Sequence, residues 1–190
     1  MNQIEKAAEV LKLGGIIAYP TETVYGLGAN IFNEIAIRRL FEVKHKSLSK
    51  PISVAVSNFK MLDSIACVFE KDKEILKKLL PGPVTIILPK KEVVSDLLTT
   101  GNGLIGIRFP ENEIIREIIE KAGFPITATS ANFSGEEDVT EAKYVKPEVD
   151  FVVEGECKYK RPSTVVDLIN RRILRESVNI EEVKQALKLS

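Results

Sequence analysis

Short apolar runs rich in β-branched residues alternate with amphipathic segments along the whole chain, and this alternation limits the fold more than any other feature. Residues 16–19, 52–56, 84–88 and 104–108 are typical of buried strands. Between them, apolar residues recur at the three- and four-residue spacing of helices. Strands interleaved with helices form a sheet that helices cover. We therefore expect an α+β fold with a twisted, mixed sheet flanked by helices on both sides.

The helical pattern also suggests where individual elements begin and end. Helices are predicted over residues 4–13, 34–43, 59–66, 71–80, 113–122 and from Asn179 to Leu187. Asn179 followed by Glu182 is typical of an N-terminal cap, and Gly14 of a helix stop. Further strands are expected at 126–129, 151–153, 164–168 and 173–174. Because the last two are predicted to form a hairpin, the sheet cannot be all parallel.

Length and composition narrow the class of protein. At 190 residues the chain fits one domain, 1–190, with a full core. Lys plus Arg and Asp plus Glu are 27 each, so any site for a polyanion must come from local clustering of charge. The N-terminus lacks the pattern of a secretory signal and no apolar run is long enough to span a membrane, which predicts a cytoplasmic protein. The two cysteines, Cys67 and Cys157, are expected to be reduced thiols.

Several catalytic motifs are missing from the sequence. There is no phosphate-binding G-x-x-x-x-G-K-[ST] loop, and residues 26–28 lack the third glycine of a dinucleotide fingerprint. The single histidine, His45, lies between two lysines and has no carboxylate beside it in sequence. No residues have the spacing of zinc ligands. The chemistry that remains belongs to Thr, Ser, Asn, Lys and Arg at strand ends, which bind and orient anions.

Five segments gather such residues, and the first two carry hydroxyls, glycines and lysines. Residues 20–28 follow a strand that ends at Pro20, and their glycines let the backbone approach a ligand closely. The alternative for this segment is a tight structural loop. Lys44, Lys46 and Lys50 converge where a helix ends. They could clamp a triphosphate, or they could simply cap the helix in solvent.

The other three segments carry an amide, two arginines and more hydroxyls. Ser130 and Asn132 project to one side of an extended segment, where they could hold a phosphate or ribose or form an Asx-type turn. Arg108 could grip a carboxylate with its planar fork, or form a surface ion pair with a nearby glutamate. In the fifth segment, residues 160–167 lead basic and hydroxyl groups into a strand and are followed by Arg175.

Taken together and in order, these segments resemble the YrdC-like family, the threonylcarbamoyl-AMP synthases. The matching residues are 14–28, 81–85, 106–110, 130–132 and 163–167. The resemblance covers nearly the whole chain. It implies a YrdC/RibB-like fold with a concave, positively charged face.

The resemblance also implies an activity. Such an enzyme joins L-threonine, bicarbonate and ATP into threonylcarbamoyl-AMP and releases pyrophosphate. A separate transferase complex is then expected to move the threonylcarbamoyl group to an adenosine of tRNA. The chemistry fits the residues, because two anionic reactants meet and need fixed positive charge more than a nucleophile. Mg²⁺ is expected with the triphosphate, held by substrate oxygens and water, so no protein ligand for a metal is predicted.

Individual roles follow from the same resemblance. Threonine is expected to contact Thr23, Arg108 and Ser163. ATP is expected to contact Lys46, Lys50, Ser130, Asn132 and Arg175, with Lys44 in the same basic cluster, and the first four of these are the candidates for catalysis. Two positions depart from the family. Lys46 stands where an arginine is usual, which keeps the charge but loses the fork. Ala55 stands where a histidine is often found.

Two other functions compete with this one. The first is a module of the same fold that binds double-stranded RNA or tRNA without synthase activity, with an affinity that falls steeply with salt. The second is a carbamoyl-transfer enzyme, since YrdC-like domains occur in hydrogenase maturation proteins. The neutral net charge argues against the first. The missing acylphosphatase and zinc-finger segments argue against the second.

Overall fold

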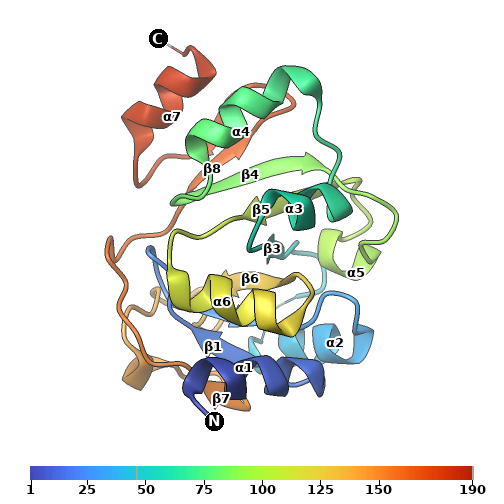
Figure 1. Cartoon of the computed structure of the whole chain (residues 1–190), viewed down its shortest axis with the longest axis vertical. Helices are drawn as coiled ribbons and strands as arrows, with labels where there is room; N and C mark the ends of the chain where they lie inside the picture. The colour runs from blue at the N-terminus through green and yellow to red at the C-terminus, as the bar shows by residue number, and fades with distance from the viewer. Residues whose placement is uncertain (46, 190) are drawn as a thin grey trace.

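The computed structural model describes residues 1–45 and 47–189, and one nine-stranded sheet runs through them (Figure 1). The strand order is β7-β1-β2-β6-β3-β5-β4-β8-β9. The strands are β1 (Ile17–Tyr19), β2 (Gly26–Gly28), β3 (Ser53–Ala55), β4 (Val84–Pro89), β5 (Leu104–Arg108), β6 (Ile126–Ser130), β7 (Phe151–Val152), β8 (Thr164–Asp167) and β9 (Arg172–Arg175).

The mixed sheet predicted from the sequence is confirmed. Three pairs are parallel, β1 with β7, β3 with β5 and β4 with β8, and the other five are antiparallel. The predicted hairpin is β8 with β9. β2 was not expected, because two glycines in three residues disfavour a strand. It forms because its neighbours β1 and β6 supply hydrogen bonds on both sides.

Helices α1 (Gln3–Lys12), α2 (Glu34–Val43), α3 (Phe59–Ile65), α4 (Lys73–Leu79), α6 (Glu113–Ala122) and α7 (Ile180–Leu187) lie where helices were predicted. Two short 3₁₀ helices, η1 (Glu70–Asp72) and η2 (Ala142–Tyr144), and a four-residue helix, α5 (Asp96–Thr99), complete the set. The predicted helix 71–80 therefore begins as η1. α5 was missed because one turn is too short to show periodicity.

The N-termini of α1 and α7 are capped in different ways. In α1 the Asn2 side chain accepts from the backbone N–H of Glu5, whose carboxylate accepts from the backbone of Asn2, which makes a full capping box. The capping predicted at α7 is wrong. Asn179 adopts a left-handed backbone with φ of 56°, and its side chain donates to the Glu182 carboxylate instead of accepting from the helix backbone.

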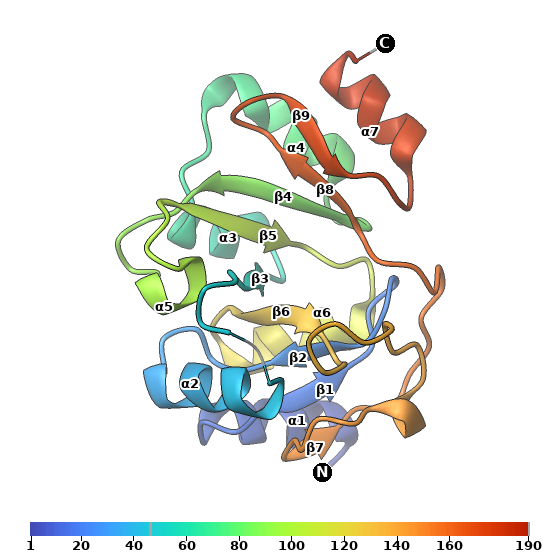
Figure 2. The ribbon, with the colours of Figure 1, turned by 180° about the vertical axis from the view of Figure 1, so that it is seen from behind.

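In the half of the sheet around β1, both faces are buried. Because successive side chains of a strand point to opposite faces, Ile17 and Tyr19 pack beneath α1 and α6, and Ala18 packs on the opposite side with α2. Figures 1 and 2 show α1 and α6 together on one face and α2 on the other. Helices therefore cover both sides here, as the sequence predicted.

In the half around β5 and β4, the same alternation separates a core from an open floor. Ile105 and Ile107 face the core, whereas Gly106 and Arg108 face a cavity. Figure 2 shows these strands in front of α3 and α4, which cover the opposite face. None of the helices formed by the described residues is both long enough and apolar enough to cross a membrane.

Candidate active site

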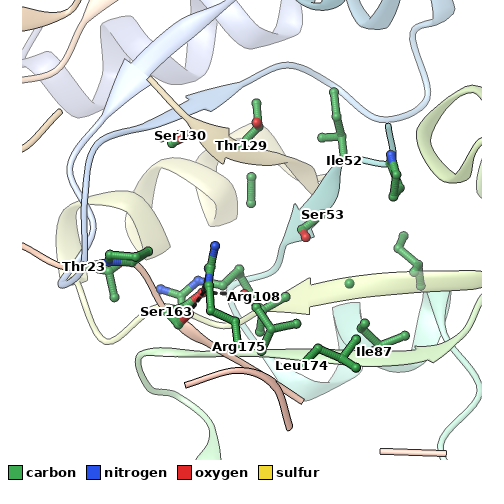
Figure 3. Close-up of a pocket in the computed structure, with 18 of the residues that line it drawn as sticks. Thr23, Ile52, Ser53, Ile87, Arg108, Thr129, Ser130, Ser163, Leu174 and Arg175 are labelled. Atoms are coloured by element: carbon green, nitrogen blue, oxygen red, sulfur yellow. Dashed lines mark hydrogen bonds between the residues drawn. The ribbon is translucent and has the colours of Figure 1, made fainter. Parts of the chain in front are cut away.

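A cavity of about 610 Å³ lies on this open strand face. Its lining comes from most strands of the sheet and from the loops at their ends. Five of the residues predicted for the site line it: Thr23, Arg108, Ser130, Ser163 and Arg175. In Figure 3, Arg108, Arg175 and Ser163 lie close together, Thr23 is beside them, and Ser130 and Thr129 lie across the cavity. Residues far apart in sequence thus meet in one hollow.

Arg175 and Ser163 form one hydrogen-bonded group at the cavity wall. The Arg175 Nε donates to the Ser163 carbonyl at 2.9 Å, and its Nη2 donates to the Ser163 Oγ at 3.2 Å. The Ser163 Oγ also lies 2.7 Å from the Thr85 Oγ1. The antiparallel pairing of β8 with β9 brings Arg175 beside the start of β8 and so creates this contact.

Burial lowers the pKa of the Arg175 guanidinium, and Arg108 nearby acts in the same direction, whereas Asp138 opposes both. Arginine stays charged at any physiological pH. The shift therefore reports a cation that has lost part of its hydration. An anionic ligand would restore favourable interactions to such a group.

The cavity lining carries charges of both signs, with one more positive side chain than negative. Three arginines and two aspartates line the cavity: Arg108, Arg172, Arg175, Asp138 and Asp167. Arg172 is paired with Asp167. Burial alone would raise the pKa of that carboxyl, but hydrogen bonds from Asn170 and Arg172 together lower it. Arg108 is likewise paired, with the Glu22 carboxylate, and the positively charged face stays a prediction.

Arg108 is buried and already partly engaged. Its Nη1 donates to the carbonyls of Gly82 and Val84 at 2.8 and 2.9 Å, and its Nη2 pairs with the Glu22 carboxylate. The alternative to carboxylate binding was a surface ion pair with a nearby glutamate, whereas the pair observed joins Arg108 to Glu22, 86 positions away. It is internal, with side chains only 7% and 3% exposed. The guanidinium nevertheless remains part of the cavity lining.

The loop after β1 presents Thr23 to the cavity. The Thr21 Oγ1 lies 2.7 Å from the Thr23 Oγ1, donates to the Val24 carbonyl and accepts from the backbone N–H groups of Thr23 and Val24. This is a hydroxyl-closed turn. Thr23 is thus held in place by its neighbour, and its hydroxyl lies at the edge of the site.

Ser130, at the end of β6, begins a loop that Lys44 holds from behind. The Lys44 Nζ donates to the Ser130 carbonyl and, at 2.8 and 3.0 Å, to the carbonyl and the Oδ1 of Asn132. The Ser130 Oγ donates to the same Oδ1 at 2.6 Å, and the Asn132 Nδ2 donates to the Glu136 carbonyl. Ser130 and Asn132 thus bind each other and Lys44 in one network, to which Lys44 is the contributor from the predicted lysine cluster.

The structure brings the remaining predicted residues to different places. Lys44 and Asn132 are buried, only 3% and 5% exposed, and neither belongs to the cavity lining. Lys50 is exposed and directly precedes Pro51, which lines the cavity. Lys46 lies outside the described residues. Direct contacts of these four residues with ATP stay predictions, and for Lys44 and Asn132 the geometry favours support of the Ser130 loop.

A second contact joins the Lys44 turn to the same loop. The His45 ring stacks on Phe133 with centroids 4.6 Å apart and planes 6° from parallel. His45 has a left-handed backbone with φ of 51°. The sequence interpretation asked only whether this histidine had a carboxylate partner, and so missed its packing role.

Glu22 and Thr85 were also missed as parts of the site. Glu22 belongs to the conspicuous segment 20–28 but was passed over among hydroxyls and glycines. The feature that could have identified it is that Glu22 is a single acidic residue in an otherwise uncharged stretch. Thr85 had a comparable signal, a single hydroxyl in an apolar strand.

Comparison with known proteins decides the family. The family model for Sua5, YciO and YrdC, described as "Telomere recombination", matches residues 9–177. The chain belongs to the Sua5/YciO/YrdC family. A Methanocaldococcus jannaschii protein is 39% identical over 185 residues, 92% of this chain and 87% of its own length. The threonylcarbamoyl-AMP synthase of Pyrococcus abyssi is 38% identical over 172 residues, 87% of this chain and 51% of the relative.

A solved structure of the Sua5/YciO/YrdC family agrees with the fold described above. P. abyssi Sua5 complexed with L-threonine matches with a TM-score of 0.91 at 35% identity, over 96% of this chain and 56% of that chain. This chain therefore spans about half of the Pyrococcus protein.

Ala55, one of the two departures from the family, is not part of the cavity lining. Ala55 is fully buried and packs with Ile126 and the apolar side chains of α1 and α6. The methyl group thus fills a core position two residues from Ser53 on the same face of β3, and unlike Ser53 it is not part of the cavity lining.

Proposed function

We propose that this chain is an L-threonylcarbamoyladenylate synthase, a nucleotidyltransferase acting on L-threonine, bicarbonate and ATP. One observation carries the proposal: five hydroxyl and cationic side chains, from four of the five segments singled out in the sequence, line a single cavity. They are Thr23, Arg108, Ser130, Ser163 and Arg175. The name of the Pyrococcus relative and its complex with L-threonine support the same reaction.

The reaction divides into two steps. Threonine's amine and bicarbonate first form an N-carboxylate with loss of water. An oxygen of that carboxylate then attacks the α-phosphorus of ATP, the bond to the bridging oxygen breaks, and pyrophosphate leaves. Both reactants of the second step are anions, so the enzyme must hold them together and neutralise their repulsion.

The residues of this chain divide this work between them. Arg108 binds the α-carboxylate of threonine through its free N–H groups, and the hydroxyls of Thr23 and Ser163 orient the amine and side chain. Arg175 neutralises phosphate oxygens, helped by the charges of Lys50 and Lys46. The Ser130 hydroxyl binds phosphate or ribose, with Asn132 and Lys44 holding its loop.

ATP enters as a substrate, and Mg²⁺ accompanies its triphosphate, held mainly by phosphate oxygens and water. Among residues 1–45 and 47–189 no cluster of three or more His, Cys, Asp or Glu could hold a metal ion. The product then passes to a tRNA threonylcarbamoyl-transferase complex, with weak tRNA contact to the enzyme itself, in the cytoplasm.

A direct assay tests the proposal. The protein is incubated with ATP, Mg²⁺, bicarbonate and L-threonine, and the products are followed by mass spectrometry and by pyrophosphate release. Threonylcarbamoyl-AMP should form, and none should form without threonine. Pyrophosphate release that does not require threonine would overturn the assignment.

Two variants test the site within this assay. Ser130→Ala and Lys50→Ala should lower activity while circular dichroism and the melting temperature stay close to wild type. Lys60→Ala, an exposed lysine of α3, is the matched control and should be fully active. Wild-type rates in both site variants would remove Ser130 and Lys50 from the active site.

A further inference from the structure

Arg108 is held on one side by three acceptors. Its Nη1 uses both hydrogens on the carbonyls of Gly82 and Val84, at 2.8 and 2.9 Å. Its Nη2 uses one hydrogen on the Glu22 Oε1. A guanidinium carries five N–H bonds in a fixed plane. The Nε hydrogen and one Nη2 hydrogen have no acceptor among the residues that the structure describes.

Glu22 is itself fixed, and it lies behind the arginine. Its Oε2 accepts the backbone N–H of Glu111 at 3.2 Å, and its own carbonyl accepts the backbone N–H of Tyr159 at 2.8 Å. The side chain is 3% exposed and is not part of the cavity lining, although Thr21 and Thr23 on either side of it are. Glu22 can therefore reach a ligand only through Arg108.

These contacts orient the arginine. A carboxylate paired with arginine fixes the plane of the guanidinium as well as its charge. With Nη1 and half of Nη2 engaged, the edge that can still grip a carboxylate with two bonds is the one formed by Nε and Nη2. A buried arginine that loses one partner can rotate to recover a hydrogen bond, which would move that edge.

We propose that Glu22 is a positioning residue for the amino-acid substrate, holding Arg108 so that its Nε and Nη2 edge faces the substrate carboxylate. This inference rests on the proposed function, because it takes threonine as the carboxylate that Arg108 binds. Glu22 tunes recognition of the amino acid and leaves recognition of the nucleotide alone. Arg175, to which the proposed function assigns the phosphates, makes no hydrogen bond to Glu22.

The test compares Glu22→Ala and Glu22→Gln with wild type in steady-state kinetics, and measures threonine binding by calorimetry. Glu22→Ala should raise the KM and the dissociation constant for threonine about 10- to 100-fold, the effect of a lost charge-assisted hydrogen bond. Glu22→Gln keeps an acceptor oxygen for Nη2 and should recover part of this loss, leaving a rise of about 3- to 10-fold. The KM for ATP should stay within about twofold of wild type in both.

Glu111→Gln is the matched control. It removes a carboxylate from the loop that follows β5, but its side chain faces Lys158 at 3.9 Å and not Arg108. Its threonine KM should equal that of wild type. If Glu22→Ala does not fold, the Glu22→Gln measurement decides alone.

The outcomes separate this inference from the proposed function. A wild-type threonine KM in Glu22→Gln, or an equal rise in the KM for ATP and for threonine, would show Glu22 to be a purely structural residue and would overturn the inference. A wild-type protein that makes no threonylcarbamoyl-AMP would overturn the proposed function instead.

Discussion

The two walls of the cavity use positive charge in different ways. On the wall formed by the Ser130 loop, the Lys44 ammonium is buried behind the chain, where it binds two carbonyls and an amide oxygen. On the wall formed by β5, β8 and β9, Arg108 and Arg175 belong to the lining itself. Lys44 thus supports the loop that presents the Ser130 hydroxyl, whereas Arg108 and Arg175 line the cavity themselves.

This difference follows from the geometry of the two side chains. A lysine ammonium has three donors that radiate from one atom, so it can gather several carbonyls of a turn around itself. An arginine fork can donate backwards to the protein and forwards to a ligand at the same time. Loss of Lys44 should therefore damage both the fold and activity, whereas loss of Arg175, whose hydrogen bonds among the described residues are to Ser163 alone, should damage activity alone.

The largest expected effect is that of Lys44→Met. It removes three hydrogen bonds from a buried cation. Breaking such a network costs about 3–5 kcal/mol of folding stability, and a misplaced loop of about 1 Å lowers activity about 100-fold. Urea unfolding and the adenylate assay measure both. A variant of normal stability but low activity would place Lys44 in the cavity and remove the distinction between the walls.

Next is Arg175→Met, which changes the lining itself. Activity should fall about 10- to 100-fold because a charge-assisted hydrogen bond to phosphate is lost. Unfolding free energy should stay within about 1 kcal/mol, because the lost bonds to Ser163 lie at a partly exposed site. Arg38→Met, on the exposed side of α2, is the control. A stability loss as large as that of Lys44→Met would contradict the comparison.

Ser163→Ala should have a smaller effect on the same wall. Its Oγ contacts the Thr85 hydroxyl at 2.7 Å and the Arg175 Nη2 at 3.2 Å. Loss of one neutral hydrogen bond of about 1 kcal/mol should raise the threonine KM about fivefold. Thr85→Val, which removes the partner hydroxyl, should shift the same constant by less. An unchanged threonine KM in Ser163→Ala would take Ser163 out of the amino-acid site.

The smallest effect is expected at Asp150, which lies on neither wall. A hydrogen bond from Arg39 holds the pKa of its carboxyl below the ordinary value of 3.8, the backbone N–H of Ile16 acts in the same direction, and burial opposes both. The folded pKa is depressed, so this stabilisation is present at neutral pH and is lost as the pH falls through the folded pKa. Both side chains are over a third exposed, which limits the gain to about 1 kcal/mol or less.

Urea unfolding of wild type and Asp150→Asn at several pH values measures this contribution. The difference between them should be largest near pH 7 and should be lost as the pH falls through the folded pKa, which lies below 3.8. The adenylate assay should be unchanged. A difference that grows as the pH falls would mean that folding raises the pKa of Asp150 instead of lowering it.

Local patterns in the sequence were enough for most elements. The apolar periodicity predicted the helix over Glu34–Val43 and the strand over Leu104–Arg108 with their observed bounds. It failed at β2, where the neighbouring strands and not the residues themselves decide the conformation. At α7 the helix was predicted correctly and only the cap was wrong, because the Asn179 side chain binds Glu182 instead of the helix backbone.

For the site, the sequence could supply the residue types but not their directions. Which of the basic residues face a ligand depends on side-chain contacts across 86 positions, such as those of Lys44 with Ser130 and of Arg108 with Glu22. No spacing rule relates such pairs, because the chain between them folds through several elements.

The order of strands and helices, the mixed sheet and the set of hydroxyl and cationic residues were all determined by the sequence alone, since they depend on local periodicity and on motifs of a few residues. Only the tertiary structure decided that Lys44 supports a loop, that Glu22 restrains Arg108, and that one face of β5, β4 and β8 stays open as a floor. Those features depend on which distant groups become neighbours when the chain folds. A polar group that is buried in this way then forms a hydrogen bond or ion pair with its new neighbour.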